Sequence, residues 1–147
     1  MIRVRLFLCS ESCAIDARYN AISAFHILEN LTVAILPAAI PKISVVTIVD
    51  RETGDPEFID YQLQVHLGGQ LLLNNPVRIG FLGQPAARAV LEWQGMLVPT
   101  SGPLVFSLLH NDQVQATWRV LIQGPAQPAL QMHFPPQQAV PPEGINR

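Results

Sequence analysis

The densest group of carboxylates in this sequence lies in a short stretch between two apolar runs. Residues 50–57 read Asp-Arg-Glu-Thr-Gly-Asp-Pro-Glu. Carboxylate oxygens on an end loop are ligands that Ca²⁺ prefers, so the candidate metal ligands are Asp50, Glu52, Asp55 and Glu57. The same stretch is also typical of a solvated hairpin, in which glycine and proline form the turn and Arg51 neutralises part of the negative charge. The sequence leaves both interpretations open.

A second possible metal ligand pair is His26 with Glu29. On a helix, two residues three positions apart share a face and could hold a metal ion together with two further ligands. No second pair lies nearby in the sequence, because His66, His110 and His133 are on separate segments. Ordinary strand-end or surface histidines are the simpler interpretation, and we expect no cofactor.

The two cysteines, Cys9 and Cys13, are separated by three residues. They could form a small redox loop or half of a zinc site, but the chain has no further cysteine to complete such a site. Free thiols are therefore expected, because cysteine often behaves as a small core residue. Two cysteines do not make the framework of a secreted disulfide-rich domain, so we expect a reducing, cytoplasmic environment.

Trp93 and Trp118 fall on the apolar phase of their segments, with Tyr61 and Phe106 on similar phases. Such residues could line a carbohydrate-binding face, but aromatic residues in alternating phase more often belong to a core. No phosphate loop, dinucleotide turn, nucleophile elbow or zinc-protease helix is present. No nucleophile, base and orienting group can be named together, so we expect a protein that is not an enzyme.

Alternation with a period of two residues is the dominant pattern, and it predicts strands. It is clearest at 58–67, where five apolar residues alternate with polar ones. The same pattern places Val114, Trp118 and Val120 on one face of a strand, and Ile2, Val4, Leu6 and Leu8 on one face of another. We expect strands over 2–9, 21–28, 42–50, 58–67, 69–73, 77–82, 87–97, 104–110 and 113–122.

Turn residues separate these segments, among them Asn74-Asn75-Pro76, and a short helix over 23–30 is an alternative to the second strand. Strands at short, regular spacing predict an all-β fold, a two-sheet antiparallel sandwich of about eight or nine strands. The segments 43–49 and 104–109 are apolar on both faces, which predicts central strands covered twice or strands at an interface.

The composition changes after Gln123, because 124–147 holds six of the 13 prolines and only two charged residues. We expect a β-sandwich domain over 1–123 and a Pro-rich C-terminal tail or linker over 124–147. Within that tail Leu130, Met132 and Phe134 alternate like a strand, and they are the candidate interaction residues. They would stay ordered only if the backbone also paired with an exposed sheet edge, of this chain or of a neighbour.

Charged residues make up only 14% of the 147 residues, against about 25% in a typical soluble domain, and hydrophobic residues make up 49%. We therefore expect a partner protein or a second subunit to cover some apolar surface. The net charge is −2 and the basic residues are spread along the chain, so nucleic acid is not an expected partner. Pro37, Pro41 and Lys42 interrupt the longest apolar stretch, which argues against a membrane span.

The stretch Leu6-Phe7-Leu8-Cys9 followed by 20–31 (Asn-Ala-Ile-Ser-Ala-Phe-His-Ile-Leu-Glu-Asn-Leu) resembles an uncharacterised bacterial family described only as a domain of unknown function. Residues 97–106 and the segment around Trp118-Arg119-Val120 are similar to it as well. The resemblance implies a bacterial, cytoplasmic β-sandwich and brings no catalytic residues with it.

Together these observations favour a non-enzymatic β-sandwich that acts through protein contacts, as a homo-oligomer or an accessory subunit. The alternative is a module that binds Ca²⁺ or a small carbohydrate through the 50–57 loop or an aromatic face.

Overall fold

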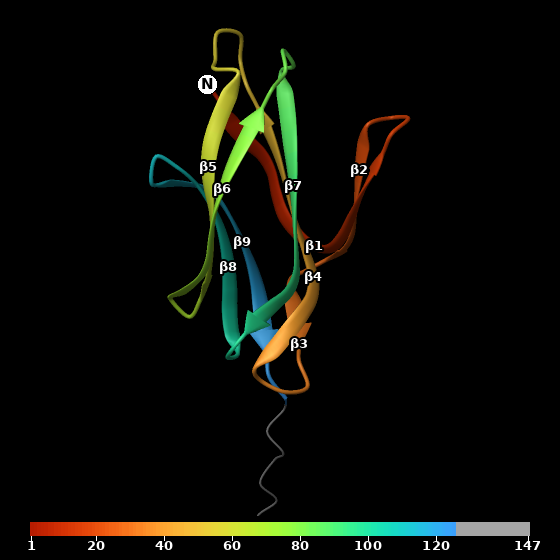
Figure 1. Ribbon diagram of the computed structural model, residues 1–147, viewed down its shortest axis with the longest axis vertical. Coiled ribbons are helices and arrows are strands. Elements are labelled where there is room, and N and C mark those ends of the chain that lie inside the picture. Colours follow the sequence, from red (N-terminus) through yellow and green to blue (C-terminus); the bar gives the residue numbers. More distant parts are fainter. Residues whose placement is uncertain (126–147) are drawn as a thin grey trace, which may run out of the picture.

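The computed structural model describes residues 1–125 and contains nine strands and no helix in that range (Figure 1). The chain is an all-β sandwich of two sheets, as the alternation predicts. No part of residues 1–125 forms a helix long and apolar enough to cross a membrane. The strands are β1 (Arg3–Asp16), β2 (Ala21–Ile27), β3 (Asn30–Thr32), β4 (Ala38–Asp50), β5 (Phe58–Leu67), β6 (Gln70–Gly80), β7 (Ala86–Val98), β8 (Gly102–His110) and β9 (Gln113–Gln123).

One sheet has four strands in the order β2-β1-β4-β7, and the other has five in the order β3-β9-β8-β5-β6. Neighbouring strands are antiparallel, except that the short β3 runs parallel to β9. The predicted antiparallel pairing is therefore correct for every pair of strands except β3 with β9. The sequence pattern does not predict β3, because three residues are too few to show an alternation. The last strand ends at Gln123, and the candidate interaction residues Leu130, Met132 and Phe134 lie outside the described residues.

The core lies between the two sheets and follows the predicted alternation most closely in β5. There Ile59, Tyr61, Leu63, Val65 and Leu67 are all buried. Burial raises the pKa of the Tyr61 hydroxyl to about 12. The prediction that 43–49 is covered on both faces is confirmed, because β4 is the central strand between β1 and β7 and almost every residue of this segment is buried.

The predicted turn at Asn74-Asn75-Pro76 is wrong, because these residues lie inside one continuous strand, β6. Asn74, Asn75 and Pro76 pair with residues of β5, and β6 is the outer strand of its sheet. Proline has no amide hydrogen to donate, so a strand can tolerate it where one side has no neighbour to bond. The turn residues therefore mark an edge strand and not a chain reversal.

Near two β-bulges, the prediction of which residues share a face of the strand is wrong. Between Val4 and Leu6 the pairing of β1 with β4 shifts, so Val4 packs on the core while Leu6 and Leu8 lie on the opposite side of the sheet. Between Leu108 and Leu109 the pairing of β8 with β9 shifts in the same way, and Val114 is exposed. A bulge adds one residue to one strand, so the residues beyond it point to the opposite faces of the sheet. The alternation of apolar residues alone does not reveal such a shift.

The N-terminal strand is longer than predicted, because β1 continues through the polar stretch 10–16. The helical alternative over 23–30 is wrong, since these residues form β2, a connection and the start of β3. His26 has a φ of 52°, in the left-handed region that histidine adopts more readily than most residues. The extension of β1 and the strand β2 together form a hairpin that stands away from the sandwich in Figure 1.

Candidate functional site

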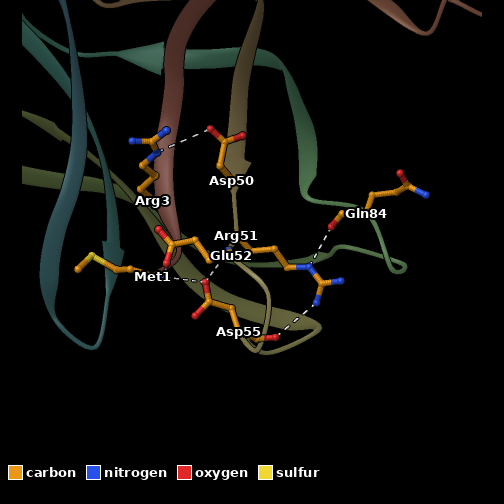
Figure 2. A network of polar contacts seen from close by, with 7 residues as sticks. All are labelled: Met1, Arg3, Asp50, Arg51, Glu52, Asp55 and Gln84. Atoms are coloured by element: carbon orange, nitrogen blue, oxygen red, sulfur yellow. Dashed lines mark hydrogen bonds and ion pairs between the residues drawn. The ribbon is translucent and has the colours of Figure 1, made fainter.

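Two carboxylates of the predicted calcium loop bind the ammonium group of Met1 (Figure 2). The nitrogen lies 2.9 Å from Glu52 Oε2 and 2.9 Å from Asp55 Oδ2. The hydrogen bonds to Glu52 and Asp55 raise the pKa of this amine, and the same amine is the main cause of a lowered pKa at Asp55. The loop is closed as a turn, because the amide of Glu52 also donates to Asp55 Oδ2 at 2.8 Å.

Glu57 lies on the other side of the loop and has its own partners. Arg51 Nη1 is 2.7 Å from Glu57 Oε1, and the amide of Gly83 donates to Glu57 Oε2 at 3.0 Å. The Gly83 amide is the largest cause of a lowered Glu57 pKa, followed by Arg51. Arg51 also donates from Nε to the carbonyl of Gln84 at 2.9 Å, which ties the loop to the turn before β7 (Figure 2).

Asp50, at the end of β4, faces Arg3 and Arg5 of β1 at 3.8 and 3.5 Å. Each of the four predicted ligands is thus within ion-pair distance of a cation of this chain. Within residues 1–125 no group of three or more histidine, cysteine, aspartate or glutamate side chains is placed to hold a metal ion. Calcium binding at the 50–57 loop stays a prediction, and the ion pairs above would compete with it.

The histidine and the cysteines that the sequence suggests for metal or thiol chemistry do not form a site together. His26 Nδ1 lies 2.7 Å from Glu11 Oε2, and no helix places His26 and Glu29 on one face, because His26 is in β2 and Glu29 is in the connection to β3. Cys9 and Cys13 are free thiols, as expected, and Cys9 is fully buried in the core. Burial raises the pKa of both thiols, which disfavours the reactive thiolate.

The aromatic residues do not share an exposed face in the described part of the chain. Trp93 is in β7 and Trp118 is in β9, so they belong to different sheets, and both pack partly buried against the core. The apolar phase of Trp118 predicts a buried core residue, but the side chain is only half-buried, and its indole Nε1 donates to the carbonyl of Leu28 at 2.7 Å. Phe106 is fully buried.

The hairpin of β1 and β2 is a feature that no sequence motif predicts. From Arg3 to Ser10, β1 pairs with β4, and from Ser10 to Asp16 it pairs with β2 instead. The four-stranded sheet therefore divides at Ser10, and the segment 10–27 projects as a two-stranded arm (Figure 1). We call this segment the arm. It carries four of the exposed large apolar side chains, Ile15, Tyr19, Phe25 and Ile27.

The outer strand of the arm, β2, differs from the other three strands that end a sheet. Natural proteins protect such edges by short length, by proline or by charged side chains. β3 has three residues, β6 contains Pro76 and Arg78, and β7 contains Arg88 and Glu92. β2 reads Ala-Ile-Ser-Ala-Phe-His-Ile and has none of these devices. It is the least protected edge in the described sandwich.

Between the arm and the sheet lies a groove of about 780 Å³. Its floor is the outer face of β1 and β4, where Leu8 and Val46 are 8% and 0% exposed although they point away from the core. Ile22 and Ala24 of β2 form the wall on the arm side. On the opposite side the groove is lined by residues 80–82 and by the start of β7. Most of the groove's lining residues are apolar.

Arg88 bridges this groove from β7 to the tip of the arm. Its guanidinium donates to the backbone oxygen and to the side-chain oxygen of Asn20. Both acceptors are neutral, so Arg88 holds the arm without being neutralised. Sequence reasoning missed the contact of Arg88 with Asn20, because the two residues are 68 positions apart.

No protein-family model matches this sequence, and no curated protein matches it significantly. Among solved structures, the chain is similar to an immunoglobulin-like protein from Pseudomonas aeruginosa, with 11% sequence identity and a TM-score of 0.41. The similarity covers 84% of this chain and 97% of that one.

Proposed function

We propose that this protein is a non-enzymatic β-sandwich that acts through protein contacts, and that its contact strand is the β2 edge of the arm. The observation that carries the proposal is the combination of an unprotected edge with exposed apolar side chains on a projecting hairpin. A two-stranded hairpin is marginally stable by itself in water. A third strand added to β2 would give its unpaired backbone groups partners and would pack beside the exposed Phe25.

A second copy of the chain is the partner that fits this edge. In an antiparallel contact around a two-fold axis each strand meets itself, so any charged side chain near the axis faces the same charge. Ala21–Ile27 contains no aspartate, glutamate, lysine or arginine. Two arms would then form one four-stranded sheet in the order β1-β2-β2-β1, shared between the subunits.

The test is the mass of the full chain in solution over a series of concentrations, for the native sequence and for Phe25→Lys. Phe25 is 50% exposed, so lysine fits the folded chain and places a charge on the edge, as protected edges have. We expect a dimer for the native chain and a monomer for Phe25→Lys.

Val114→Lys is the matched control, because Val114 is an equally exposed apolar residue, 57%, at the start of β9. It should leave the mass of the dimer unchanged. A native chain that stays monomeric at every concentration would exclude the second copy as partner. If the Phe25→Lys variant is still a dimer, the contact between the two copies does not involve β2.

We also propose that the protein is bacterial and cytoplasmic, as its resemblance to a family without assigned function implies. The two free thiols support a reducing compartment. Fractionation of the native host tests this point, and recovery of the protein outside the cytoplasm would contradict it. The predicted contact of Leu130, Met132 and Phe134 also belongs to this proposal, as an additional strand for an exposed edge.

A further inference from the structure

We infer that the groove beneath the arm is a binding site for an amphiphilic carboxylate, a molecule with an apolar chain and a single carboxylate head. The chain would lie along the floor of the groove and the head would bind Arg88. The inference concerns the sheet-facing side of the arm and does not depend on the pairing of β2 with a second copy.

The size and lining of the groove are those of a ligand site. Small-molecule sites in proteins have volumes of roughly 300–1,000 Å³ and are lined mostly by apolar groups with a few polar ones. The groove, at about 780 Å³, lies in this range. Leu6, Leu8, Val46 and Ile48 supply a continuous apolar floor from two neighbouring strands, and Ile22 faces them from the arm.

The charge in the groove selects the head group. The lining contains two arginines, Arg5 and Arg88, and no acidic residue of the described chain. Arg5 Nε is 3.5 Å from Asp50, so its charge is compensated. Arg88 is half-buried and has no carboxylate within ion-pair distance in residues 1–125, which leaves one uncompensated positive charge at the rim.

The nearest acidic residue on the same strand is already bound elsewhere. Glu92 Oε1 lies 3.2 Å from Lys42 Nζ and accepts a hydrogen bond from Ser44 at 3.2 Å. It therefore does not neutralise Arg88.

A carboxylate would replace the neutral oxygens of Asn20 on Arg88. The planar guanidinium matches a carboxylate with two parallel hydrogen bonds, and the carboxylate adds an attraction between opposite charges that the neutral oxygens of Asn20 lack. Asn20 is the tip of the arm, so the exchange would release the arm from β7 while the chain fills the space beneath it. An uncharged chain could occupy the same floor but would gain nothing at Arg88.

The experiment measures the binding of palmitate and of 1-hexadecanol to the full chain by equilibrium dialysis, below the concentration at which either aggregates. The two probes share the chain and differ in the head. We expect palmitate to bind about ten- to hundredfold more tightly than hexadecanol, the difference that a charged hydrogen-bond pair supplies.

Arg88→Gln should remove that preference by lowering the affinity for palmitate to about that for hexadecanol. Arg119→Gln, a change at an exposed arginine of β9 in the other sheet, should alter neither probe. Equal binding of the two probes by the native chain would overturn the inference. So would loss of both probes in Arg88→Gln, because Arg88 would then only hold the arm in place.

A second pair of variants locates the chain of the ligand. Ala24 faces the groove, and Ala14 is exposed on the opposite face of the arm. Ala24→Phe should weaken both probes at least about tenfold by filling the groove, while Ala14→Phe should not. Equal effects of the two variants, or no binding of palmitate by the native chain, would contradict the site. Palmitate binding should persist in monomeric Phe25→Lys, which separates this inference from the proposed self-association.

Discussion

Replacing Thr47 by valine should stabilise the protein. Thr47 lies in the central strand β4, between Phe7 of β1 and Ala89 of β7, and it is completely buried. Its Oγ1 atom is a buried side-chain oxygen without a hydrogen-bond partner in the described chain. In the unfolded chain water satisfies this hydroxyl group, so folding carries the cost of removing it from water.

The size of the effect follows from that cost. A buried polar group without a partner costs about 1–3 kcal/mol, and valine keeps the β-branched shape while it removes the hydroxyl group. We therefore expect Thr47→Val to raise the free energy of unfolding by about 1–3 kcal/mol. For a chain near this length each kcal/mol corresponds to about 2–4 °C in Tm.

Urea denaturation of both proteins, with Tm as a second readout, measures the change. Thr117→Val is the control, because Thr117 is exposed in β9, and its effect should stay within about 0.5 kcal/mol. A loss of more than about 1 kcal/mol in Thr47→Val would refute the reasoning, because it would mean that the hydroxyl group makes a favourable interaction.

Three further predictions concern charge, hydrogen bonding and thiol access. Arg78 binds Asp60 with two hydrogen bonds of 2.7 and 2.8 Å and holds the pKa of that carboxyl group below its usual value. The ion pair therefore stabilises the folded protein above the usual Asp60 pKa, and this stabilisation is lost as the pH falls through the lowered pKa. Arg78→Gln should raise the Asp60 pKa towards its usual value in an NMR titration. An unchanged Asp60 pKa would contradict the ion pair. Trp118→Phe removes the indole hydrogen bond and should cost about 1–3 kcal/mol in urea denaturation, whereas a change below about 0.5 kcal/mol would show that the bond does not matter. Alkylation followed by mass spectrometry should modify Cys13 before Cys9, because only Cys9 is fully buried, and the reverse order would contradict the described burial.

The alternation of apolar residues predicts the sandwich well where a strand is regular and paired on both sides. In β5 every second residue from Ile59 to Leu67 is buried, as expected. The one register shift in its pairing, between Val65 and His66, places the extra residue on β6, so β5 keeps its faces along its whole length. The same reasoning fails at Leu6 and at Val114, since each lies beside a bulge that shifts the pairing of its strand by one residue. The partner at Leu6 is β4, far away in the sequence, whereas the partner at Val114 is the preceding strand, β8.

Edges and long-range contacts limit what the sequence reveals about function. Pro76 looks like a turn residue until β6 is known to be an outer strand. The acidic stretch 50–57 can be identified from the sequence, but three of its cations, Met1, Arg3 and Arg5, come from the N-terminal end of β1 and the residues before it. The arm and its open edge follow from the division of one sheet at Ser10, which has no signature in local residue types.

The central claim is that β2 pairs with a strand of a second copy, and hydrogen exchange of its backbone amides tests it most directly. The measurement compares the full chain at two protein concentrations, one below and one above the midpoint of the mass transition. The account predicts that amides within Ala21–Ile27 exchange more slowly at the higher concentration, while those of the outer strand β6 do not change. Exchange in β2 that is rapid and independent of concentration would contradict the claim.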